Sequence, residues 1–168
     1  MTTLYLVRHG ETFDNVRQVL QGQMPGELNE TGIKQAEKVR DEMKDVHLDA
    51  IVASDLRRSV QTACIIAEPH GLKVVTTPLL RERDWGDFTG MFIPDIRDKV
   101  WPENVESLPQ MKERARQFLQ FIRNTYPDQQ VLAVGHGIIN KAVQAVFYNK
   151  QMNEVDKMSN AEVRVLGI

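Results

Sequence analysis

Two histidines of this sequence each stand beside glycine, directly after a short apolar run. Arg8-His9-Gly10 follows Leu4 to Val7, and Gly135-His136-Gly137 follows Val131 to Val134. A neutral imidazole is a competent nucleophile, and its ordinary pKa of ~6.5 leaves it largely neutral at cell pH. A planar guanidinium can bond two phosphate oxygens at once. Histidines placed in this way beside an arginine indicate phosphoryl chemistry.

A third apolar run ends in further basic residues. Ala50 to Ala53 is followed by SDLRRS, in which Arg57 and Arg58 are adjacent, and spacing alone does not say which of them faces a ligand. A helix that begins after such a strand offers free N–H groups and the positive end of its dipole to an anion. Phosphoryl transfer needs mainly positioning and charge neutralisation, with an in-line nucleophile and a proton source. These residues therefore predict a pocket for a compact dianion, of which phosphate is the natural example.

The elements that must position these residues alternate along the chain. Short runs rich in Val, Ile and Leu are expected as strands: Leu4 to Val7, Ala50 to Ala53, Lys73 to Val75, Val131 to Val134 and Val163 to Leu166. Apolar residues at helical spacing predict helices between them, over 33–43, 60–67, 111–122 and 138–146. This alternation predicts an α/β fold, a three-layer sandwich with a mostly parallel central sheet and helices on both faces. Because ligands bind at the carboxyl ends of such strands, the three strand ends should converge.

The composition limits the class of protein. With 168 residues, 42% apolar and 26% charged, the chain is expected to form one globular domain over residues 1–168, neither disordered nor fibrous. The net charge of −2, from 21 basic and 23 acidic residues, gives no overall attraction to nucleic acid or to an anionic membrane. We therefore expect neither as a partner, and a homodimer stays open.

Three features predict a cytoplasmic location. The single cysteine, Cys64, cannot form an internal disulfide, and its place in an apolar helical pattern predicts a buried thiol in a reducing compartment. The start MTTLYLV lacks the basic and long apolar regions of a secretion signal. No apolar run approaches the ~20 residues that a membrane span requires.

The stretch from about 78 to 109 differs in composition from the rest of the chain. It holds Gly86, Gly90, both tryptophans (Trp85 and Trp101) and four of the seven prolines: Pro78, Pro94, Pro102 and Pro109. Such a segment is too aromatic and apolar for a linker, so we expect a long functional loop or lid that packs on the domain.

Several motifs in order resemble those of the histidine phosphatase superfamily, the phosphoglycerate mutase-like enzymes. The segment LVRHGET, with Asn15 after it, is similar to the signature of that family. It is followed by LNETGIKQA, SDLRRSVQTA, LLRERDWGDFTG and AVGHG, in the order found in the family. The resemblance extends from Leu4 to about Asn160.

The resemblance implies roles for particular residues. His9 would be the nucleophile that becomes phosphohistidine, and Glu82 the proton donor to the leaving group and later the base for water. Arg8, Arg58 and His136 would hold the phosphoryl oxygens, so the match selects Arg58 over Arg57. Further substrate contacts would come from Thr12, Asn15, Gln21, Gly22 and the backbone N–H of Gly137. Family members of this kind need no metal and no other cofactor.

Two local expectations accompany these roles. Gly10 should let a phosphate approach the backbone, and Trp85 or Phe88 should give Glu82 apolar surroundings that favour its protonated form. Two departures from the family pattern also stand out. Thr89 occupies a place where members often carry an acidic residue, and the chain ends at Ile168, soon after its last expected strand.

The reaction favoured by these features is hydrolysis of a phosphate ester on a small phosphorylated metabolite. A mutase must also hold a second anionic group, and the stretch from Met91 to Leu108 has only Arg97 and Lys99 as basic residues. The alternatives are a mutase-type phosphoryl transfer, a phosphohistidine protein phosphatase, and a non-catalytic phosphate-binding module on the same fold.

Overall fold

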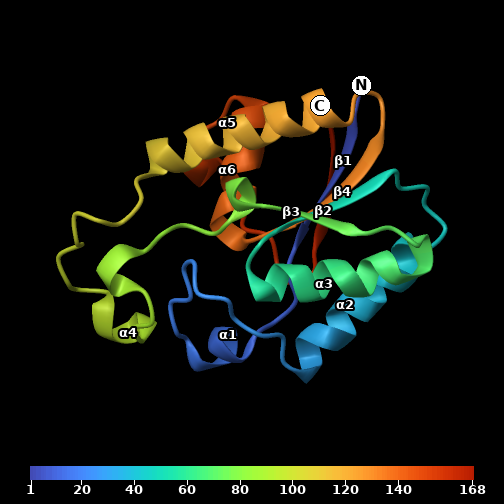
Figure 1. The fold of residues 1–168 in the computed structure, drawn as a ribbon. Coiled ribbons are helices and arrows are strands. Elements are labelled where there is room, and N and C mark those ends of the chain that lie inside the picture. Colours follow the sequence, from blue (N-terminus) through green and yellow to red (C-terminus); the bar gives the residue numbers. More distant parts are fainter.

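Five strands form one sheet in the order β3-β2-β4-β1-β5, in a computed structural model that describes residues 1–168 (Figure 1). Their bounds are β1 (Thr3–Arg8), β2 (Ala50–Ser54), β3 (Val74–Thr77), β4 (Gln130–Gly135) and β5 (Val163–Gly167). Strands β1 to β4 are parallel, and β5 pairs antiparallel with β1 at one edge. The predicted α/β class and each of the predicted strands are confirmed.

Helices cover both faces of this sheet. The long ones are α2 (Glu30–Met43), α3 (Arg57–Ala67), α5 (Leu108–Thr125) and α6 (Gly137–Tyr148), and the short ones are α1 (Phe13–Arg17) and α4 (Ile93–Ile96). Helices α2 and α3 lie on one face, and α5 and α6 lie on the other (Figure 1). The four predicted helices are therefore confirmed, whereas α1 and α4 fall in segments that carry no helical period.

The core consists of two apolar layers, one on each face of the sheet. Side chains alternate along a strand, so Leu4 and Leu6 of β1 pack toward α5 and α6, and Val7 packs toward α2 and α3. All five residues of β2 are buried, because helices cover both of its faces. The continuous apolar runs in the sequence are a consequence of this double burial.

The strand register brings the predicted strand ends together. Arg8 at the end of β1 pairs with Gly135 at the end of β4, so the two His-Gly pairs follow at the same level. Helix α6 begins at Gly137, directly after that edge. Strand β2 lies on the other side of β4 and ends at Ser54, close to the start of α3.

The segment from Pro78 to Ser107 is tied to the loop that follows β1. It contains α4 and two short 3₁₀ turns, Pro78–Leu80 and Gly86–Phe88, and it ends where Ser107 caps α5. The Leu20 N–H donates to the Met91 carbonyl at 2.9 Å, and the Gly90 N–H donates to the Leu20 carbonyl at 2.7 Å. Two segments far apart in sequence therefore share one surface, with α4 near α1 in Figure 1.

Cys64 departs from its predicted environment. The residue is exposed on α3, whereas its neighbours Ala63, Ile66 and Ala67 are buried. The prediction of a buried thiol was wrong because Cys64 lies just outside the face of α3 that packs on the sheet.

None of the helices combines the length and the apolar content that a membrane crossing requires.

Candidate active site

His9 lies at the end of β1 with only 2% of its surface exposed. Its Nδ1 is 2.7 Å from the Gly10 carbonyl oxygen. Because a carbonyl only accepts, Nδ1 carries the proton and donates it, which leaves the lone pair on Nε2. Burial lowers the pKa of His9 well below its ordinary value, and the positive charge of Arg58 lowers it further. The ring is therefore neutral, with a nucleophilic Nε2.

His136 faces His9 from the end of β4, with 5.0 Å between the two ring centroids. Its Nε2 lies 2.7 Å from the Ser54 hydroxyl and 3.0 Å from the Ser59 hydroxyl. The Ser54 hydroxyl accepts from the Leu56 N–H, so its own hydrogen is free for Nε2. Burial lowers the pKa of His136 well below its ordinary value, so the ring is neutral. Its proton is then on Nδ1, which is buried and has no hydrogen-bond partner.

Two arginines, Arg8 and Arg58, line the same cavity as His9. Arg58 donates to the carbonyls of Gly22 at 2.8 Å and Met24 at 2.5 Å, and Arg8 donates to the carbonyl of Met158 at 2.8 Å. Burial lowers the pKa of Arg58 to about 10, so it stays cationic at neutral pH. These backbone contacts fix both side chains and leave the Nε of each one buried and without a partner.

Three buried N–H donors on side chains grouped around His9 have no partner in the protein. They are Nε of Arg8, Nε of Arg58 and Nδ1 of His136. A buried donor left unpaired costs about 1–3 kcal/mol, so three of them at one place indicate a ligand that accepts hydrogen bonds. Two of the donors are cationic, which makes the matching ligand an anion with several oxygens.

The structure also separates the two adjacent arginines of the sequence. Arg58 is 1% exposed and lines the pocket, whereas Arg57 points outward and pairs with Glu27 at 3.1 Å. Successive residues on a helix lie on different faces, so only one of the two can point inward. The residue indicated by the family resemblance is the one that the fold turns toward the site.

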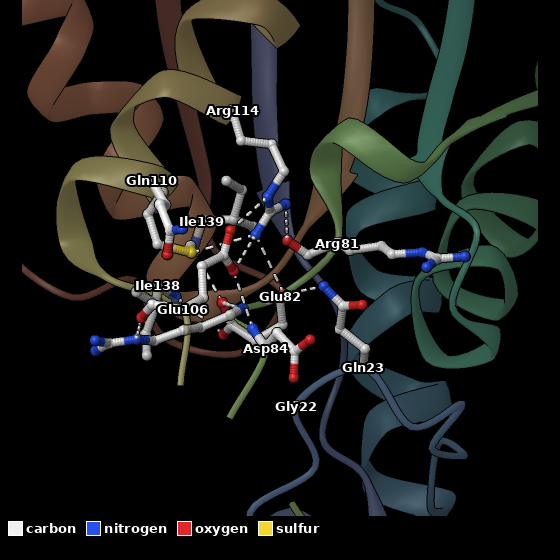
Figure 2. Close-up of polar contacts among 12 residues, drawn as sticks. Gly22, Gln23, Arg81, Glu82, Asp84, Glu106, Gln110, Arg114, Ile138 and Ile139 are labelled. Atoms are coloured by element: carbon white, nitrogen blue, oxygen red, sulfur yellow. Dashed lines mark hydrogen bonds and ion pairs between the residues drawn. The ribbon is translucent and has the colours of Figure 1, made fainter. Parts of the chain in front are cut away.

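Glu82 holds the start of α6 with its carboxylate (Figure 2). One oxygen accepts from the Ile138 N–H at 3.0 Å, and the other accepts from the N–H groups of Ile139 at 3.0 Å and Arg83 at 2.9 Å. A carboxylate is favourable at a helix N-terminus, where N–H groups lack partners within the helix. Backbone hydrogen bonds hold this side chain beside the pocket, and Trp85, one of the two expected apolar neighbours, lines the same cavity.

Arg114 of α5 fixes the backbone that carries Glu82 (Figure 2). Its guanidinium forms a two-point pair with Glu106, with N···O distances of 3.0 and 2.9 Å. It also donates to the carbonyls of Leu79 at 3.0 Å, Arg81 at 2.6 Å and Glu82 at 3.3 Å. The sequence did not single out Arg114, because none of these partners lies close to it along the chain.

Replacing Arg114 with Met should lower the free energy of unfolding by about 3 kcal/mol, because it leaves the largely buried Glu106 carboxylate without a cation and removes the donor to the carbonyls of Leu79 and Arg81. The side chains of this pair are 16% and 14% exposed. Arg116→Met is a matched control on the same helix, since its pair with Glu113 is more than half exposed. The control should lose less than about 1 kcal/mol in urea denaturation. Equally small losses in both variants would contradict the structural role of Arg114.

A cavity of about 140 Å³ lies beside His9, Arg8, Arg58 and Glu82. The predicted site residue His136 is fully buried next to His9 and does not line the cavity itself. The predicted residues that line it are Arg8, His9, Asn15, Gln21, Gly22, Arg58, Glu82 and Gly137. The lining residues that the sequence did not indicate as site contacts are Val19, Leu20, Trp85, Ile93, Ile138 and Lys157. The cavity therefore has a polar inner end and an apolar wall that comes partly from the segment after β3.

Thr12 does not line this cavity, although it was expected to contact the substrate. It is fully buried and caps α1, where its hydroxyl accepts from the Asn15 N–H at 3.0 Å. The same hydroxyl donates to the Gln21 side chain at 3.0 Å. Thr12 therefore positions two pocket residues and has no free polar group for a ligand.

Gly10 was expected to let a phosphate approach the backbone, but its close contact is with another part of the chain. A Cβ atom on Gly10 would lie 2.5 Å from the backbone oxygen of Gly32, in the first turn of α2. A Cβ atom on Gly32 would likewise clash with the backbone oxygen of Glu11. The two glycines let the start of α2 pack directly on the loop after β1, so the close approach is made by a helix rather than by a ligand.

The loop before β5 completes the site, although no local motif in this loop indicates such a role. The Asn160 side chain donates to the His9 carbonyl at 3.1 Å and to the Asn15 side chain at 3.4 Å. The Met158 carbonyl, in the same loop, accepts from Arg8. Because β5 pairs with β1, this loop returns to the end of the strand that carries His9.

The fold and the site together define a class of protein that binds a phosphoryl group and can transfer it. The evidence is a mostly parallel sheet with two neutral histidines, two arginines whose Nε atoms are buried, and a carboxylate at its carboxyl edge. Residues 4–168 match the family model of the histidine phosphatase superfamily (branch 1). The chain belongs to this family, and its relatives support the prediction of a phosphatase enzyme.

Three known proteins illustrate the similarity. The Bacillus subtilis protein named uncharacterized phosphatase PhoE is 40% identical over 141 residues, which cover 82% of this chain and 72% of that protein. A metal-independent phosphoserine phosphatase of Arabidopsis thaliana is 31% identical over 99% of this chain and 76% of its own length. The solved structure of YhfR from Bacillus stearothermophilus has a TM-score of 0.94 and 28% identity, and the match covers 100% of this chain and 92% of that one.

Proposed function

We propose that this protein hydrolyses phosphate monoesters of small metabolites, without a metal ion, through a phosphohistidine at His9. The observation that carries the proposal is the set of three buried, unpartnered donors on Arg8, Arg58 and His136 beside the His9 ring. A phosphoryl group offers three equatorial oxygens, one for each donor, and phosphoryl transfer depends mainly on such charge neutralisation.

The first step forms a bond between nitrogen and phosphorus. Nε2 of His9 attacks the phosphorus with its lone pair, while the bond from phosphorus to the ester oxygen breaks. Glu82, protonated at this stage, gives its proton to the ester oxygen, and the alcohol leaves. The guanidinium groups of Arg8 and Arg58 and the Nδ1–H of His136 hold the three phosphoryl oxygens as their charge shifts.

The second step returns the protein to its starting state. Glu82, now a carboxylate, takes a proton from a water molecule, whose oxygen attacks the phosphorus. The bond between phosphorus and Nε2 breaks, and its electron pair returns to His9. Inorganic phosphate leaves, and Glu82 carries the proton that the next cycle requires.

The size and walls of the pocket favour a small substrate over a phosphoprotein. The cavity of about 140 Å³ is partly closed by Trp85 and Ile93, which belong to the segment of residues 78–109 that we propose as a lid on a single 1–168 domain. Asn15, Gln21, Gly22 and the Gly137 backbone line the remaining wall and are proposed substrate contacts. We place the reaction in the cytoplasm, where phosphorylated metabolites are found.

Hydrolysis of p-nitrophenyl phosphate in excess EDTA tests this proposal. Turnover should persist in the chelator, because the positive charge in the site comes from arginines. A panel of phosphorylated metabolites and a phosphohistidine peptide, compared by kcat/KM, should favour a metabolite. Absence of turnover from about pH 5 to pH 8 would leave only phosphate binding. A clear preference for the peptide would move the function to protein dephosphorylation.

A further inference from the structure

Lys157 is a cation at the pocket that the proposed reaction does not use. It lies between the 3₁₀ turn Met152–Glu154 and β5, and it lines the same cavity as His9. Its Cε is 3.6 Å from the position that a Cβ on Gly137 would occupy, and the Arg8 guanidinium is 3.5 Å from that position. Lys157 therefore lies beside Arg8 at the start of α6.

The Lys157 ammonium makes no salt bridge and no hydrogen bond with any other residue of the chain. The residue is exposed, in contrast to the buried donors on Arg58 and His136. Partial burial beside the pocket lowers the pKa of Lys157 and the charge of Arg8 lowers it further, whereas Glu82 raises it. The exposed ammonium thus lies at the solvent side of the pocket and close enough to interact with Glu82, the proposed proton donor.

The pocket carries one more positive charge than a bound phosphoryl dianion neutralises. Arg8, Arg58 and Lys157 line the pocket as cations. Glu82 is an anion in the free protein, but it adds no charge in the step in which the proposed mechanism has it protonated. A phosphate monoester dianion balances two of these three positive charges. The third is Lys157, which is the most exposed of the three and stands apart from the buried donors.

We propose that Lys157 binds a carboxylate on the leaving alcohol and so selects phosphate monoesters of hydroxy acids. This inference rests on the proposed function, because Glu82 marks the side of the pocket where the alcohol leaves. A carboxylate supplies the one negative charge that the pocket still lacks, whereas a second phosphate group would supply two. Lys157 would act on substrate choice and not on the transfer of the phosphoryl group.

Two esters that differ only in a carboxylate provide the test. O-phosphoserine has this group, and O-phosphoethanolamine is the same molecule without it. Wild-type protein should prefer O-phosphoserine in kcat/KM. In Lys157→Met, the ratio of the two kcat/KM values should fall about 10-fold, mainly through KM, because a charge-assisted bond at a partly exposed site is lost. Lys157→Arg should retain most of the preference.

A matched control separates a contact from a general loss of charge. Lys141 on α6 is close enough to act on the pKa of Lys157, but it does not line the pocket. Lys141→Met should leave the ratio within about twofold of wild type. Equal losses on both esters in Lys157→Met, or an unchanged ratio, would overturn the inference and leave the proposed phosphatase intact. No turnover of either ester or of p-nitrophenyl phosphate by wild type would overturn the proposed function itself.

Discussion

Replacing His9 with Ala should lower kcat for phosphate release by about 10⁴-fold to 10⁶-fold, since a nucleophile that forms the covalent intermediate has no substitute. The hydrogen bond from Nδ1 to Gly10 leaves Nε2 as the attacking atom, and the buried ring stays neutral. The measurement is phosphate release together with trapping of an acid-labile phosphoenzyme. Both the turnover and the label should disappear in His9→Ala.

Two other histidines make this prediction specific. His47 is exposed and bonded to Asp49, so His47→Ala should keep wild-type activity and serves as the control. His136 lies 5.0 Å from His9 between centroids and is proposed to bind phosphoryl oxygen through Nδ1. A label that survives in His9→Ala but is lost in His136→Ala would transfer the nucleophilic role to His136.

Replacing Glu82 with Gln should slow the hydrolysis of alkyl phosphates by about 10²-fold to 10³-fold, which is the usual contribution of a general acid. Nitrophenolate leaves without a proton, so kcat/KM for p-nitrophenyl phosphate should fall far less than kcat/KM for the alkyl phosphates. The comparison within one variant matters, because Glu82 also accepts from the N–H groups of Ile138 and Ile139. An amide at this position presents an NH₂ group to one of these donors, and any resulting displacement affects both substrates equally.

The kcat/KM values for the two substrates therefore separate proton donation from positioning, because kcat/KM reports the steps up to departure of the alcohol, whereas the later attack of water is common to both. A matched loss on both would assign Glu82 to holding α6 and not to acid catalysis. Glu103→Gln is a suitable control, since Glu103 is an exposed carboxylate in the same segment. This variant should retain wild-type activity on both substrates.

Several site residues could be predicted from the sequence because the residues that indicate them are their close neighbours along the chain. His9 and His136 each follow a strand whose apolar run is visible in the sequence, and parallel strands end at one edge. Arg57 and Arg58 show the limit of such reasoning, because their order along the chain does not state which of them the helix turns inward. The choice depended on the family resemblance, and the placement depends on how α3 packs.

Other residues were assigned a wrong environment or were missed. Thr12 and Gly10 stand in the expected motif, but their partners are Gln21 and the start of α2. Lys157 carries no motif at all, and it reaches the pocket only because β5 pairs with β1. In each case the deciding contact is made by a residue distant in the chain.

The sequence by itself determined the α/β fold, the edge of the sheet that holds the site, and the two histidines with their arginines. These follow from apolar periodicity and from short motifs, which are local properties of the chain. Only the tertiary structure decided how Glu82 is held, since its partner Ile138 is 56 residues away, and that Asn160 contacts His9 across 151 residues. Contacts over such separations arise from the packing of the sheet and its helices, and no local pattern of residues encodes them.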